Sequence, residues 1–343
     1  MIMGMLSYPE KIYFALARKY VKKVLQRGDV LGVLLFGSIV KNAVSTPNDI
    51  DIAVIYDGRE ILFNTIKASP VKIDALYYPR EVIQEILYER NIRNRKDTWF
   101  KTTLWLNMLR NSLILYDPYC ILSQWKKKAS DWKWTSYEIQ LAYKNSFESL
   151  KESINLYARE KYFESLLAVR DSNYNYLIFK LMKRQMIPSP RPKDLYRLVR
   201  RYEQSIRDSF DRVHGLDDRE MKSNLASLIS LFTEVWDTYD IPKKRGAYSE
   251  YINSLESYQK NELDITILNL RYSAFLLLRE MLAKERYVTI VPYDTYQHLR
   301  LYEKSKSFKE VHELYQLLHY SEDEVDKEYI RENIKIMKKL LLH

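Results

Sequence analysis

The feature that most constrains this chain is a short polar signature held between two apolar runs. Residues 30–36 form an apolar run of the length of a buried strand, and Gly37-Ser38 ends it. Ten residues later, Asp49-Ile-Asp51 opens a second apolar run. Because side chains alternate along a strand, Asp49 and Asp51 are expected to share one face of it.

Two neighbouring carboxylates repel each other unless something neutralises their charge. A hard divalent cation bound through oxygen atoms is the simplest candidate. A third strand-like run, residues 71–77, places Asp74 in a similar apolar setting. If this strand pairs beside the one that carries Asp49 and Asp51, the three carboxylates converge. The sequence therefore predicts a metal site at Asp49, Asp51 and Asp74.

This pattern resembles the polymerase β-type nucleotidyltransferase superfamily, and within it the minimal, kanamycin-nucleotidyltransferase-like branch. The family pattern is an apolar residue, Gly-Ser, about nine to thirteen residues, and then Asp-apolar-Asp, with a later Asp on another strand. The chain departs from two family preferences, at Asn42 and Asn48. Asn tolerates the left-handed backbone conformation, so both changes are compatible with the pattern. The resemblance covers about residues 5–125.

The resemblance implies transfer of a nucleoside monophosphate from an NTP to a hydroxyl, with release of pyrophosphate and with two Mg²⁺ ions. It implies that Asp49 and Asp51 contact both ions, while Asp74 holds the ion beside the nucleophile and can take the proton of the hydroxyl. The nucleotide-binding residues implied are Gly37, Ser38 and Lys41.

Each of these residues also has a structural interpretation. The aspartates are also compatible with turn formers or charges at a strand edge, and Gly37-Ser38 with a plain turn between a strand and a helix. Lys41 is equally compatible with an exposed surface lysine. The alternative function is a non-catalytic nucleotide- or RNA-binding regulator that keeps the fold.

Periodicity predicts an α+β protein: a small mixed-sheet nucleotidyltransferase domain in residues 1–125, followed by an all-α helical bundle in residues 135–343. We expect the active site in the cleft between them. Residues 59–67 are predicted to be helical and residues 125–134 to be a polar connector. The first-domain strands are predicted at residues 30–36, 50–56, 71–77 and 112–117. The later helices are predicted at residues 135–159, 161–185, 193–212, 217–239, 248–258, 262–284, 307–319 and 322–341.

Two polar features of the helical part admit two interpretations. Arg170-Asp171 is a candidate pair lining the cleft, although a structural pair is favoured. A basic run from Arg191 to Arg201 is compatible with contacts to a nucleotide or RNA backbone, although a solvated helix face is slightly favoured.

The charge balance leaves the acceptor open. The chain carries 55 basic and 45 acidic residues, a net charge of +10, which permits an anionic partner. A small molecule, an RNA end or a protein side chain all remain compatible as acceptor. Cys120 is the only cysteine, which excludes an internal disulfide and a cysteine-based zinc site. With neither a signal-peptide pattern nor a membrane-spanning run, we expect a cytoplasmic protein without membrane contact.

Overall fold

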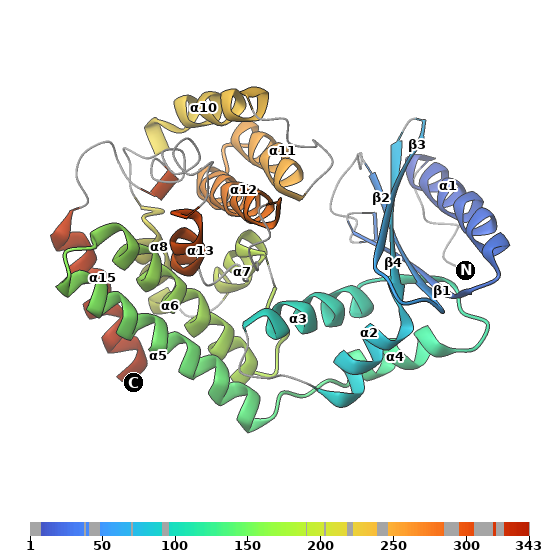
Figure 1. Cartoon of the computed structure of the whole chain (residues 1–343), viewed down its shortest axis with the longest axis horizontal. Helices are drawn as coiled ribbons and strands as arrows, with labels where there is room; N and C mark the ends of the chain where they lie inside the picture. Colours follow the sequence, from blue (N-terminus) through green and yellow to red (C-terminus); the bar gives the residue numbers. More distant parts are fainter. Residues whose placement is uncertain are drawn as a thin grey trace. The chain divides into compact units, whose positions relative to one another are not determined.

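The computed structural model describes twelve stretches of the chain: residues 8–37, 39–40, 49–69, 71–90, 96–189, 191–201, 204–217, 222–238, 246–284, 295–304, 318–319 and 326–342. The chain divides into two compact units, Met1–Lys133 and Trp134–His343. A mixed sheet with helices forms the first unit, and the regular elements described in the second unit are helices (Figure 1). The predicted α+β class is confirmed.

The first unit is built on a five-stranded sheet with the strand order β3-β4-β2-β1-β5. Strands β2 and β4 are parallel neighbours, whereas the other three pairs are antiparallel. The central strands are buried on both faces along most of their length, which explains the unbroken apolar runs in the sequence. The strands are β1 (Val30–Phe36), β2 (Asp49–Tyr56), β3 (Leu62–Ala68), β4 (Val71–Pro79) and β5 (Leu113–Tyr116).

Helices cover the two faces of this sheet unequally. On one face lies α1 (Tyr8–Val24), whose Tyr20 hydroxyl hydrogen-bonds the hydroxyl of Tyr77 on β4 at 2.8 Å. Tyr78, the next residue of β4, points to the opposite face and packs edge-on against Trp105 of α3, with ring centroids 4.6 Å apart. That opposite face is covered at one end by α2 (Arg80–Gln84), the π turn η3 (Glu85–Glu89), α3 (Lys96–Arg110) and α4 (Ile121–Ser130) (Figure 1).

Two predictions for the first unit are wrong. Residues 62–68, predicted as part of a helix, form β3, because pairing with β4 satisfies their backbone hydrogen-bonding groups. The predicted polar connector, residues 125–134, overlaps the second half of α4, a helix that buries Leu122, Trp125 and Ala129. Its lysines dominate the composition, but this i, i+3, i+7 apolar spacing is the helical signal that the composition hid.

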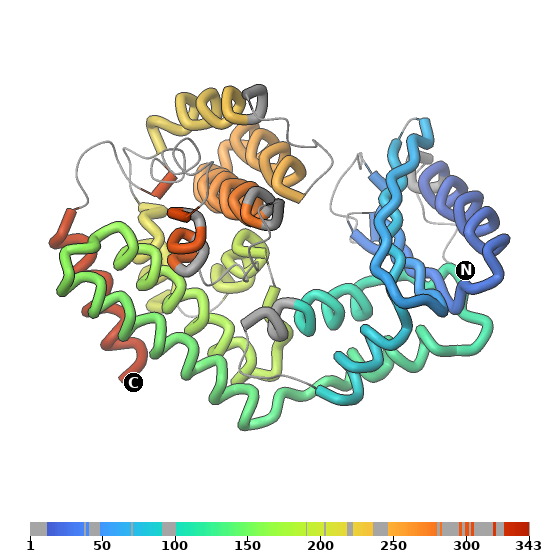
Figure 2. The backbone as a smooth tube through the Cα atoms, in the orientation of Figure 1, coloured from blue at the N-terminus to red at the C-terminus, as the bar shows by residue number. Residues whose placement is uncertain are grey.

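The second unit is a set of packed helices (Figure 2). They are α5 (Ser136–Ala158), α6 (Tyr162–Lys183), α7 (Pro192–Val199), α8 (Gln204–His214), α10 (Leu225–Thr238), α11 (Gly246–Gln259), α12 (Leu263–Lys284), α13 (Thr295–Tyr302) and α15 (Lys327–Leu342). The helix predicted at 193–212 is in fact two helices, α7 and α8. Helix α13 has no counterpart among the predicted helices. No described helix is both long enough and apolar enough to cross a bilayer.

The start of α5 shows how closely local sequence sets local structure. Thr135 and Glu138 form a capping box, with Glu138 N donating to Thr135 Oγ1 at 3.2 Å and Thr135 N donating to Glu138 Oε2 at 2.7 Å. Helix α5 then pairs with α6 through small residues. Ser146 and Ser172 each donate a hydroxyl to the other's carbonyl oxygen at 2.8 Å, which lets the two helices approach closely.

Candidate active site

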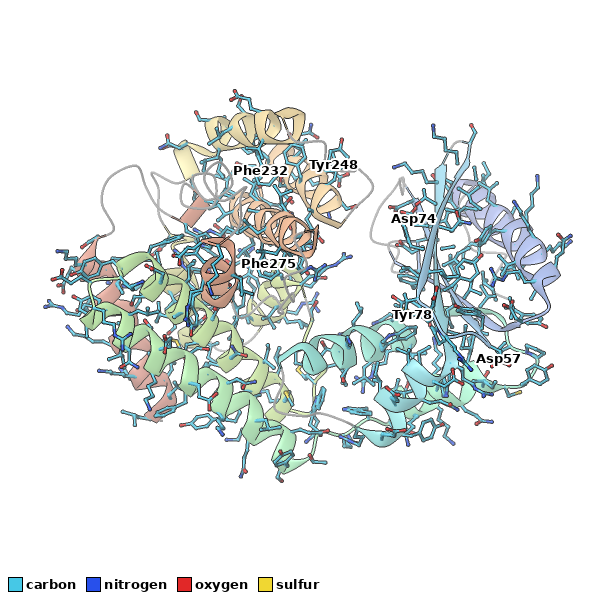
Figure 3. All side chains as sticks on the ribbon, viewed as in Figure 1. Asp57, Asp74, Tyr78, Phe232, Tyr248 and Phe275 are labelled. Atoms are coloured by element: carbon cyan, nitrogen blue, oxygen red, sulfur yellow. The ribbon has the colours of Figure 1, made fainter. Side chains whose placement is uncertain are left out.

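The pairing of β2 with β4 brings the predicted carboxylates to one place. In the parallel register, Asp51 lies opposite Asp74, and Asp49 lies opposite Lys72. Because paired residues project to the same face and side chains alternate, all four side chains share one face of the sheet. It is the face that Tyr78 also occupies, opposite to α1 (Figure 3 labels Asp74 and Tyr78 on β4). The carboxylates therefore lie at one end of this face, with the packed Tyr78–Trp105 pair at the other.

The turn after β1 is shaped around Asp51. Gly37 has a left-handed backbone, with φ +85°, and a Cβ added to it would collide with the carboxylate oxygen Oδ2 of Asp51. The preceding residue, Phe36, is the β1 partner of Asp51. Glycine meets both demands at this position, a positive φ and the absence of a side chain. The carboxylate of Asp51 thus lies against the backbone of the Gly-Ser turn, where a bound phosphate can approach closely.

Asp74 is held by a residue that the sequence analysis missed. Thr65 of β3 lies opposite Asp74 and donates its hydroxyl to Oδ1 at 2.7 Å. The contact was missed because residues 59–67 were predicted as a helix. The signal was present in the β-branched pair Thr65-Ile66 and in Phe63, two residues before it, since both residue types are typical of a strand.

The strand register aligns the three aspartates on one face, but this alignment alone does not form a metal site. Within the part of the chain that the structure describes, no group of three or more His, Cys, Asp and Glu side chains is arranged to hold a metal ion. The donor chemistry nevertheless fits a hard cation, since Asp51 and Asp74 are direct neighbours and Asp49 is the next residue on the same face of β2.

Two further predicted residues cannot be placed. Ser38 and Lys41 lie outside the described residues. Lys72, which shares the face of Asp74, is exposed and lies on β4 opposite Asp49 of β2. The described part of the candidate site therefore consists of the three aspartates, Gly37 and the newly found Thr65.

The pair Arg170-Asp171 of the second unit has a structural role. Asp171 is buried and accepts hydrogen bonds at the first turn of α13, from Thr295 N at 2.6 Å and from Thr295 Oγ1 at 2.7 Å. Arg170 turns instead to the end of α8, where its Nε donates to the carbonyl oxygen of Val213 at 3.1 Å. The two side chains each secure a different helix terminus, as expected for groups that compensate helix ends.

Much of the predicted basic run also binds within the second unit. Lys193 is mostly buried and forms an ion pair with the buried Glu250 at 2.9 Å, and Arg191 approaches the same carboxylate at 3.5 Å. Burial, opposed by the nearby Glu250 carboxylate, lowers the pKa of Lys193. Arg197 contacts Glu262 at 3.5 Å. These residues connect α7 to α11 and to the start of α12 rather than forming a free cationic face.

Comparison with known proteins identifies the first unit. Residues 19–93 match the family model described as polymerase beta, nucleotidyltransferase. This stretch includes β1 to β4, Gly37 and the three aspartates. This stretch of the first unit is therefore similar to nucleotidyltransferase domains of the polymerase β type.

A solved structure gives a weaker likeness. The chain is similar to a nucleotidyltransferase-like protein from Exiguobacterium sibiricum 255-15, with 10% sequence identity and a TM-score of 0.40, over 77% of this chain and 78% of that chain. At this level the likeness carries no argument about function. No curated protein matches the sequence of this chain.

Proposed function

We propose that this protein is a Mg²⁺-dependent nucleotidyltransferase that moves a nucleoside monophosphate from an NTP to a hydroxyl of an acceptor. The observation that carries the proposal is the parallel register that sets Asp51 directly opposite Asp74, with Asp49 on the same face. A family match over the same residues supports the reaction class. The acceptor is a small molecule, an RNA end or a protein side chain.

In this proposal each residue has a defined task. Asp49, Asp51 and Asp74 hold Mg²⁺, which when bound supplies charge neutralisation for the triphosphate and lowers the pKa of the attacking hydroxyl. Asp74 accepts the proton of the acceptor hydroxyl. The hydroxyl oxygen then forms a bond to the α-phosphorus, the bond from that phosphorus to the bridging oxygen breaks, and pyrophosphate leaves with the bond electrons. Gly37 lets the backbone approach the phosphates, and Ser38 and Lys41 contribute donors to them.

The decisive experiment follows the label from the NTP to the acceptor. The purified protein is incubated with Mg²⁺ and each of four α-³²P-labelled NTPs, alongside pooled RNA, an aminoglycoside mixture and a protein extract. Label is expected in one acceptor pool. It is expected to disappear in Asp49→Ala and in Asp51→Ala while the circular dichroism spectrum stays unchanged. Equal labelling by the wild type and both variants would refute the proposal.

The alternative, a non-catalytic nucleotide-binding regulator, makes a different prediction. A regulator would show no label in any pool yet would bind NTP. The proposed site requires that Mg²⁺-dependent NTP binding, measured by calorimetry, is lost in Asp49→Asn. Binding that survives this change would place the nucleotide elsewhere in the chain.

A further inference from the structure

The edge strand β3 presents an open strip of side chains beside the candidate site. Thr65 lies opposite Asp74 and hydrogen-bonds its carboxylate, so Thr65 projects to the face that carries the acidic residues. Side chains two positions away on a strand share its face. Phe63 and Lys67 therefore flank Thr65 on this same face, with Asp74 adjacent to the centre of the strip.

Phe63 is an exposed aromatic residue in an unusual place. Its side chain is 53% exposed, and it makes no ring contact with the other residues that the structure describes. Its neighbour Ile61 is 58% exposed, so the start of β3 is apolar as well as open. Phe63 lies on the face of the polar site, so its ring offers apolar surface to a ligand bound there. An exposed ring of this kind offers a stacking surface for a planar group.

The lysines at the other end of the strip favour a ligand with negative charge. Lys67 lies directly opposite Lys72 of β4. Like charges directly opposite each other in a sheet are destabilising. Both side chains are exposed, and neither forms an ion pair with another described residue. Lys72 also lies opposite Asp49 of β2, so the ammonium group of Lys67 is the main attraction for an anion at this end of the strip, and such an anion would relieve the repulsion between the two lysines. A polycationic acceptor such as an aminoglycoside would increase that repulsion.

Protection of the sheet edge explains only half of this arrangement. A lysine on an edge strand discourages pairing with another chain. The same edge, however, exposes Ile61 and Phe63. A strand that served only to protect the edge would be expected to carry polar residues at these two positions. An aromatic surface followed four residues later by a cationic pair suits a ligand that has both a planar ring and a negative charge.

We propose that the face of β3 formed by Phe63, Thr65 and Lys67 is the acceptor-binding strip, and that its occupant is the terminal nucleotide of a single-stranded nucleic acid. A base stacks on Phe63, and the backbone phosphate lies between Lys67 and Lys72. The terminal hydroxyl then lies near Asp74, which Thr65 orients. This inference rests on the proposed function for the role of Asp74, but the binding it describes needs no catalysis.

The test is equilibrium binding, without NTP, of fluorescein-labelled eight-nucleotide single strands with a free 3′ hydroxyl. RNA and DNA versions distinguish the two sources of the terminal nucleotide. Phe63→Ala is expected to weaken binding by about 10-fold, as for loss of one stacked base. Lys67→Gln is expected to reduce the slope of log K against log salt by about 0.7, as for loss of one phosphate contact.

A matched pair elsewhere in the chain controls for general surface effects. Phe147 on α5 is 52% exposed, and Lys151 follows it by four residues, as Lys67 follows Phe63. Phe147→Ala and Lys151→Gln should leave both the affinity and the salt slope unchanged. Asp49→Asn should still bind the strand, which separates loss of the acceptor strip from loss of catalysis.

Three outcomes would overturn the inference. One is the absence of binding of either strand to the wild-type protein. Another is equal weakening by the β3 variants and by the α5 variants. The third is binding of an aminoglycoside that tightens in Lys67→Gln, because that result would show that the strip accepts a cation.

Discussion

Two Asp–Thr pairs in this protein have the same hydrogen-bond length but lie in different surroundings. Thr65 Oγ1 donates to Asp74 Oδ1 at 2.7 Å in the first unit, and Thr295 Oγ1 donates to Asp171 Oδ1 at 2.7 Å in the second. Asp171 is 1% exposed and also accepts from the backbone at the start of α13. Asp74 is only partly buried and has another carboxylate, that of Asp51, on the neighbouring strand.

The difference shows how to separate a structural carboxylate from a functional one. The helix N-terminus supplies N–H donors and a favourable dipole to Asp171, so its charge is compensated within the fold. The register of β2 and β4 instead places Asp74 beside a like charge, an arrangement that favours binding of a cation from outside. Proximity of a polar partner does not distinguish the two carboxylates, but the second carboxylate directly opposite Asp74 does.

The largest expected effect is on the sheet side of this comparison. Asp74→Asn should reduce nucleotide transfer by at least about 100-fold, because a neutral amide neither accepts the proton of the acceptor hydroxyl nor balances Mg²⁺. The midpoint of thermal unfolding should stay within about 2 °C of the wild type. Transfer assays and calorimetry on the same preparation check both expectations. Full activity in this variant would make Asp74 no more than a strand residue.

The same substitution in the helical unit should give the reverse result. Asp171→Asn should lower the free energy of unfolding by about 2–3 kcal/mol, because a buried charge-assisted contact to a helix start is lost. Hydrogen exchange should show faster exchange at the amides of α13. Binding of Mg²⁺ and NTP should keep its wild-type affinity. Reduced binding without loss of exchange protection would show that Asp171 belongs to a ligand site.

A third prediction uses pH to sharpen the contrast between the units. Burial, together with the positive charges of Arg170 and Arg271, lowers the pKa of His214 well below 6.5 in the folded protein. Burial and the same two arginines also lower the pKa of His319. The unfolded chain takes up protons near pH 6.5 and the folded one does not, so stability is complete above that pH and falls below it. The expected slope is about 1.4 kcal/mol per pH unit for each histidine.

Urea unfolding between pH 8 and pH 5 measures this slope, and one variant tests its source. The ring of His214 lies between Tyr174 and Phe210, at centroid distances of 4.4 and 4.1 Å. Its Nε2 has no hydrogen-bond partner within the described part of the chain. His214→Phe should therefore be tolerated and should remove about half of the slope. An unchanged slope would assign the acid sensitivity to other groups.

The smallest effects should come from the two threonines. Thr65→Val removes the hydroxyl that holds Asp74 and should lower transfer by about 10-fold, while Thr65→Ser should restore it. Thr295→Val removes one of the contacts to Asp171 and should cost about 1 kcal/mol of stability without changing transfer. Parallel kinetics and urea titrations of the three variants check these expectations. If both valine variants changed only stability, the comparison between the two pairs would fail.

The amino-acid sequence was sufficient to predict those helices and strands whose patterns lie within a few neighbouring residues. The apolar runs at β1, β2 and β4 are confirmed as strands: β1 and most of β2 are buried on both faces, whereas β4 alternates between a buried face and a more exposed one. The start of α5 is also confirmed, since Thr135 and Glu138 satisfy each other within one turn. The nucleotidyltransferase resemblance of the first part of the chain is confirmed by the family match, whereas the roles of Asp49, Asp51 and Asp74 stay predictions.

The contacts between residues far apart in the sequence became known from the folded structure alone. The identity of β3 as a strand depends on a partner, β4, which its β-branched and aromatic residues suit. The same pairing alone reveals that Thr65 holds Asp74. Arg170 and Asp171 are adjacent in sequence, yet they secure the ends of two different helices, α8 and α13. Local propensity acts over a few residues, whereas strand register and helix packing join residues far apart in the sequence. These contacts therefore follow from the tertiary structure and not from the local sequence.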